Sequence, residues 1–197
     1  MEQAMNSRAF SLIELLVVMA IFAVLASLGM VAFQSTSQGT ALARTGQDVA
    51  DTIVLARQQA MARNRRVEIR FLKWPAAGGA TAFRAVQAWS VRDDQGTLEP
   101  LTRVSLFPNG VIVADTVQLS PLLQSPPAAQ GRQTYGGQER DYCAFTILAS
   151  GALEGTTAED ASYLTLINER DAAQVEPANF SAVAVNPITG ETSLFRP

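Results

Sequence analysis

Residues 10–33 read FSLIELLVVMAIFAVLASLGMVAF, an apolar run of 24 residues with a single charge, Glu14, near its start. As an α-helix this run would be about 36 Å long, which is enough to cross the hydrocarbon core of a bilayer. The residues before it, MEQAMNSRA, are polar and include Arg8. The run therefore predicts a membrane-inserted helix that follows a short polar leader.

Two simple interpretations of this N-terminus leave something unexplained. A cleaved secretory signal would have a shorter apolar run, followed by a small-x-small cleavage site and a polar mature start. A plain signal anchor explains the length of the run and Arg8 on the cytoplasmic side. It does not explain Glu14, because a carboxylate within an apolar span is costly and is by default a functional candidate. The alternative for Glu14 is an incidental side chain that snorkels to water.

A third interpretation accounts for every part of the segment. The sequence AFSLIE at residues 9–14, followed by LLVV, resembles the processing site of type IV pilins and type II secretion pseudopilins. The resemblance implies that a prepilin peptidase cuts between Ala9 and Phe10, that the new amino group of Phe10 is methylated, and that Glu14 is the assembly residue. The family usually has Gly where this chain has Ala9, but Ala is the next smallest residue, so cleavage is still expected.

Elementary electrostatics supports the role that the resemblance implies for Glu14. A buried carboxylate needs a positive partner. In a packed bundle of such helices, the nearby cations would be the Phe10 amino termini of the subunits. Glu14 is therefore expected to neutralise its own terminal amine or that of a neighbour.

The helical pattern continues beyond the apolar run. No proline occurs between Met1 and Lys73, and an apolar stripe recurs at helical spacing, whereas polar residues fall on the other faces. The helix is expected to run from about residue 10 to about residue 63, with Gly39 and Gly46 costing about 1 kcal/mol each relative to Ala. The stripe consists of Leu42, Val49, Ile53, Ala56 and Ala60, and the polar residues are Arg44, Asp48, Asp51 and Gln58.

The expected end of the helix is basic. Asn64 tolerates the left-handed conformation that ends many helices, and arginines suit the negative end of the helix dipole. A sharper hypothesis is nucleic-acid binding by a cluster that would comprise Arg63, Arg65, Arg66, Arg70 and Lys73. The net charge of −3 and the lack of interleaved aromatic residues beyond Trp74 argue against it. No nucleic-acid partner is therefore expected.

From Val67 the apolar period changes to two, which indicates strands. Val67, Ile69 and Phe71 are expected to face one way and Glu68 and Arg70 the other, in a hairpin with residues 83–91. Long irregular connections are expected at 120–141 and 169–180. Further strands are expected at 101–107, 111–119, 143–148, 163–168, 182–186 and 192–195.

These patterns predict an α+β fold, in which a long N-terminal helix packs on an antiparallel β-sheet head. Four segments are expected: a prepilin leader at 1–9, a hydrophobic transmembrane and assembly helix at 10–33, its amphipathic continuation at 34–63, and the β-rich globular head at 64–197.

Two further stretches narrow the resemblance. The sequence ARQQAMARNRRVEIRF at 56–71 is similar to the helix-to-strand junction of the minor pseudopilin H and FimT-type group. The ending at 185–195, with Thr189-Gly190, resembles that group's closing hairpin. The chain also resembles the pilin-like D protein of Verru_Chthon cassettes.

Catalytic and metal sites are not expected. The chain has no His, which removes His-based triads, and its single Cys143 lies in an apolar run typical of a buried residue. Asp93, Asp94 and Glu99 around a glycine turn are candidate calcium ligands, but their spacing matches no EF-hand loop, and an ordinary solvated turn is favoured. We expect that the protein is not an enzyme and that it uses no cofactor.

The resemblance implies a minor pseudopilin of a type II secretion-like filament. Its partners would be other pilin or pseudopilin subunits, the prepilin peptidase, the inner membrane and its assembly platform. The head would lie in the periplasm or outside, on a single-pass anchor, and later in the filament. A minor type IV pilin for adhesion, motility or DNA uptake is one alternative, and a monomeric membrane-anchored binding domain is another.

Overall fold

The computed structural model describes residues 12–76, 79–92, 96–124, 128–157, 159 and 161–197, with the backbone alone for 26–37. Helix α1 spans Leu12–Arg63. The chain divides into two compact units, Met1–Gln38 and Gly39–Pro197, and the boundary falls within this helix. The helix therefore contributes residues 39–63 to the second unit, which also holds the whole sheet.

The expected apolar stripe of α1 is confirmed, because all five of its residues are buried. Arg44, Asp48, Asp51 and Gln58 are exposed, also as expected. The helix ends at Arg63, and Asn64 adopts a left-handed φ of 51°. Its N–H donates to the Met61 carbonyl (3.4 Å), and the Arg65 N–H donates to the Ala60 carbonyl (3.0 Å). This pair of bonds is a Schellman motif, which satisfies carbonyls at the helix end.

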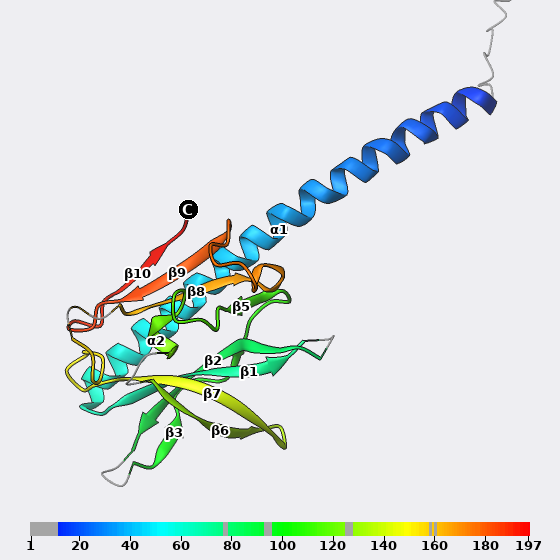
Figure 1. Cartoon of the computed structure of the whole chain (residues 1–197). Coiled ribbons are helices and arrows are strands. Elements are labelled where there is room, and N and C mark those ends of the chain that lie inside the picture. The colour runs from blue at the N-terminus through cyan, green and yellow to red at the C-terminus, as the bar shows by residue number, and fades with distance from the viewer. Residues whose placement is uncertain (1–11, 77–78, 93–95, 125–127, 158, 160) are drawn as a thin grey trace, which may run out of the picture. The chain divides into compact units, whose positions relative to one another are not determined.

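In the described residues, ten antiparallel strands form one sheet of order β10-β9-β8-β5-β2-β1-β7-β6, and β3 and β4 also pair with β2 (Figure 1). The hairpin expected after the helix is confirmed as β1 and β2. The strands are β1 (Val67–Pro75), β2 (Thr81–Val91), β3 (Leu98–Pro100), β4 (Ser105–Leu106), β5 (Val111–Val113), β6 (Ala129–Tyr135), β7 (Gln138–Ile147), β8 (Tyr163–Asn168), β9 (Phe180–Val185) and β10 (Thr192–Phe195).

The main core lies between the stripe of α1 and one face of this sheet. Val49 and Ile53 of the helix belong to one buried cluster with Ile69, Phe71 and Phe145 of the central strands. A smaller cluster of Ile112, Ala114 and Ile167 lies on the opposite face, because successive side chains of a strand alternate between faces. The predicted α+β fold is confirmed.

Three expectations about the middle of the head are wrong. Residues 120–141 are not one irregular connection, because they hold α2 (Pro121–Gln124), β6 and the start of β7. The strands expected at 101–107 and 111–119 are reduced to β4 and β5.

The other long connection was expected correctly. The stretch 169–180 begins with the short 3-10 helix η1 (Glu169–Asp171) and is otherwise irregular up to β9.

Candidate assembly and interaction surfaces

The predicted processing residues Ala9 and Phe10 lie outside the described residues. The predicted assembly residue Glu14 lies in the first turn of α1, where a negative charge is favoured by the helix dipole. Its neighbours are apolar and exposed in the isolated chain, with Leu12 at 86% and Ile13 at 70%. All of residues 12–25 are exposed. A continuous apolar surface of this size is typical of an interaction site.

In the part of the chain that the structure describes, no helix combines the length and the apolarity that a membrane span requires.

The structure divides the predicted basic cluster. Arg63, Arg65 and Arg66 are exposed at the turn from α1 to β1. Arg63 lies 3.9 Å from Glu99, and Arg66 lies 3.1 Å from Glu154. Exposed pairs of this kind contribute at most about 1 kcal/mol each. Acidic neighbours therefore offset two of the three arginines in this turn.

Arg70 is separate from this exposed turn, because it is only 6% exposed. Its Nε donates to Glu68 at 2.6 Å, and its guanidinium carbon lies 4.9 Å from the Trp89 ring and 4.2 Å from the Tyr142 ring. Another nitrogen donates to Gln133 of β6 at 3.0 Å. The expectation that Arg70 faces away from Val67 and Ile69 fits these contacts, but strands β2, β6 and β7 cover it. Arg70 thus joins four strands and is not part of an exposed basic surface.

Of the candidate calcium ligands, Asp93 and Asp94 lie outside the described residues, and Glu99 of β3 is the partner of Arg63. No group of three or more His, Cys, Asp or Glu side chains suited to a metal occurs among the residues that the structure describes.

Cys143 is buried in β7, as expected, and is only 6% exposed. Burial raises the pKa of its thiol above the ordinary value, and the nearby Asp115 raises it further, whereas Lys73 lowers it. The thiol is therefore held in its protonated, unreactive form, as befits a small buried apolar residue.

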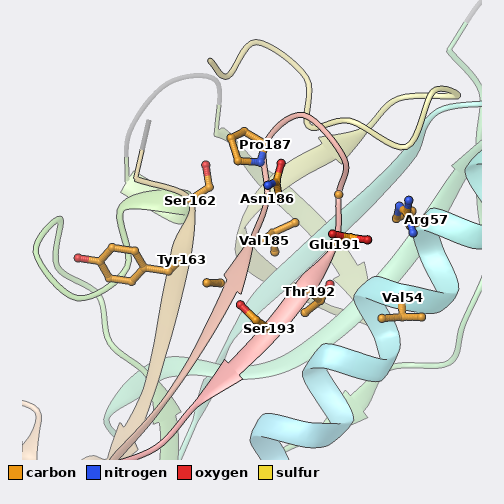
Figure 2. Close-up of a pocket in the computed structure, with 12 residues that line it drawn as sticks. Val54, Arg57, Ser162, Tyr163, Val185, Asn186, Pro187, Glu191, Thr192 and Ser193 are labelled. Carbon is orange, nitrogen blue, oxygen red and sulfur yellow. The ribbon is translucent and has the colours of Figure 1, made fainter. Parts of the chain in front are cut away.

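A groove that the sequence patterns did not indicate adjoins strand β10. It has a volume of about 680 Å³, and its lining includes Val54 and Arg57 of α1 and Thr192 and Ser193 of β10 (Figure 2). We call it the β10 groove. The Arg57 Nε donates to the Thr189 carbonyl at 2.7 Å, which ties the helix to the turn between β9 and β10. The only sequence signal near it was the Thr-Gly turn before the last strand.

Two protein-family models match this chain. A family model of the prokaryotic N-terminal methylation motif matches residues 4–30, and the model of type II transport protein GspH matches residues 45–194. No curated protein matches.

Two solved structures of the minor pseudopilin EpsH from the type II secretion system of Vibrio cholerae are similar to this chain. One has 12% sequence identity and a TM-score of 0.46, and the match covers 79% of this chain and 97% of the EpsH chain. The other has 14% sequence identity and a TM-score of 0.47, and the match covers 81% of this chain and 96% of the EpsH chain. The resemblance to pseudopilins rests instead on the family models, one over the N-terminal motif and one over most of the head. Because the second model matches well over half of the chain, this protein belongs to the GspH family of type II transport proteins.

Proposed function

We propose that this chain is a minor pseudopilin of a type II secretion-like filament, cleaved between Ala9 and Phe10 and assembled through its N-terminal helix. The pseudopilin family consists of structural filament components rather than enzymes. The observation that carries the proposal is the exposed apolar surface of residues 12–25 with the one carboxylate of Glu14. Such a surface has to be covered by lipid before assembly and by other helices afterwards.

In this proposal each segment has one task. Residues 1–9 are the leader, residues 10–33 anchor the subunit in the inner membrane and pack in the filament, residues 34–63 continue the helix into the head, and residues 64–197 form the head outside the membrane. The division between units at Gln38 and Gly39 is close to the proposed start of the amphipathic segment. The match of the methylation motif to residues 4–30 supports the leader and the anchor.

Glu14 is proposed to select and align incoming subunits. Surrounded by apolar side chains, its carboxylate is stable only beside a cation, and the terminal amine of Phe10 is the cation that processing creates. Cleavage would thus couple to assembly, because an unprocessed chain lacks this amine next to the helix.

The direct test is mass spectrometry of the chain extracted from membranes of a host with an active prepilin peptidase. We expect a chain that begins at Phe10 and carries one methyl group on its amine. The matched variants are Ala9→Gly, which restores the usual family residue and should be processed at least as completely, and Ala9→Lys, which should remain uncleaved. A wild-type chain that still begins at Met1 would contradict the proposal.

A further inference from the structure

The two edges of the sheet differ in how they are protected. At one edge, β6 carries Arg132, which is exposed and lies near Glu139 (3.7 Å) and Asp141 (3.1 Å). Charges on an edge strand discourage the pairing of another chain. At the other edge, β10 pairs with β9 on one side, and no described residue pairs with its other side. Its sequence, Thr-Ser-Leu-Phe, contains no charge and no proline.

The unprotected edge also exposes apolar side chains. Leu194 is 40% exposed and Phe195 is 61% exposed. The Phe195 ring lies 6.0 Å from the ring of Phe180 on the neighbouring strand, so the two rings form one small apolar surface. An edge strand that combines open backbone groups with apolar side chains is a ready template for an added strand.

The β10 groove also contains hydrogen-bonding atoms that have no partner among the described residues. The Thr192 hydroxyl is buried and has no hydrogen-bond partner among the described residues. Arg57 uses its Nε for Thr189, and its other nitrogens have no hydrogen-bond or ion-pair partner in the described part of the chain. A guanidinium with open donors favours a carboxylate, which it can bind with two parallel hydrogen bonds.

We propose that β10 is a docking edge that takes an extended segment of another protein as an added strand, with apolar side chains beside Leu194 and Phe195 and a carboxylate that binds Arg57. Backbone hydrogen bonds to the open side of β10 would supply affinity, and the carboxylate would supply specificity. A second copy of this chain carries no carboxylate within its strand Thr192–Phe195, and Glu191, directly before that strand, already lines the β10 groove, so a second copy is an outcome of the test rather than the proposed occupant. The inference adds to the proposed function but does not depend on it, because it rests on the head alone.

The test uses the full chain in detergent micelles and labelled eight-residue peptides in which threonine alternates with valine. The central residue is Asp, Asn or Lys, and a fourth peptide carries Asp and N-methyl groups on alternate amides. Binding is measured by fluorescence anisotropy, and its location by hydrogen exchange with mass spectrometry at residues 190–197 and 129–135.

We expect the Asp peptide to protect residues 190–197, to leave residues 129–135 unchanged, and to bind about fivefold more tightly than the Asn peptide, because a hydrogen bond to a charged group is stronger. The N-methylated peptide should not bind, because it lacks the amides that pair with β10. Arg57→Gln should remove the preference for Asp. Ser193→Glu, which adds a charge to the edge without altering Arg57, should weaken all the peptides. Arg132→Gln, on the opposite edge, is the matched control and should not change the protection of residues 190–197.

Several results would overturn the inference. These are no protection of residues 190–197 by any peptide, equal binding of the N-methylated peptide, or a preference for Asp that survives in Arg57→Gln. Protection of the same residues that rises with protein concentration in the absence of peptide would identify a second copy as the occupant. Circular dichroism of each variant separates a lost site from a lost fold.

Discussion

Gly46 of α1 and Ser181 of β9 approach so closely that a Cβ atom on residue 46 would lie 2.3 Å from the Ser181 hydroxyl oxygen. The same Cβ would lie 3.1 Å from Leu194 of β10. Gly46 is therefore the point at which the helix lies against the last two strands of the sheet, and a glycine in the middle of the helix is needed there for its size.

This contact predicts opposite outcomes for the two helix glycines. Gly46→Ala should lower the free energy of unfolding by about 1–3 kcal/mol, because overpacking outweighs the gain in helix propensity. Gly39→Ala is the matched control: its nearest neighbour would be the flexible end of Arg196 at 3.8 Å, and it should be neutral or stabilising by up to about 1 kcal/mol. Thermal unfolding of the detergent-solubilised chain measures both. Ser181→Ala should reduce the cost of Gly46→Ala, and equal costs in the two backgrounds would refute the clash.

A second prediction concerns the buried cation of Arg70. Arg70→Met removes the partner of Glu68 and the stacking on Trp89 and Tyr142, so it should destabilise the head by about 3 kcal/mol. Adding Glu68→Gln should recover part of this loss, because it removes the unpaired carboxylate. Denaturant unfolding of the single and double variants gives the coupling. Arg65→Met, at an exposed position of the same charge, should have little effect, and an equal effect there would exclude a special role for Arg70.

The thiol of Cys143 should be slow to react. Because its pKa is raised, iodoacetamide at pH 8 should alkylate the folded chain far more slowly than the urea-unfolded chain, and the folded rate should keep rising at higher pH. Alkylation followed by intact-mass measurement gives both rates. Similar rates in the two states would mean that Cys143 is accessible, contrary to its position in the core.

The last prediction concerns Glu14. Glu14→Ala should leave membrane insertion and cleavage intact, because it makes the segment more apolar, and it should leave the head folded. Incorporation into filaments should fall sharply, because the terminal amine of Phe10 loses its counter-ion. Co-purification with the other filament subunits measures incorporation, and Glu176→Ala, an exposed carboxylate of the head, is the control. Normal incorporation of Glu14→Ala would show that Glu14 lies at the membrane interface without a role in assembly.

The local pattern of the sequence was sufficient for the elements whose residues alternate regularly. The stripe of α1 and the end of the helix at Arg63 were predicted, and so were strands β8 and β10, which match the expected bounds. Each of these depends on which face of an element is apolar, and the spacing of residues within one segment reports that directly.

Other features were decided only by the tertiary structure. Strand β6 is a polar segment without apolar alternation, and it is extended because β7 pairs with it along its length. Arg70 is buried because Trp89 of β2 and Tyr142 of β7 pack against its guanidinium. Gly46 is needed because Ser181 of β9 lies beside the helix at that position. The β10 groove likewise brings together residues 54 and 57 with residues 192 and 193. Each of these depends on the approach of residues far apart in the sequence, which local periodicity does not encode.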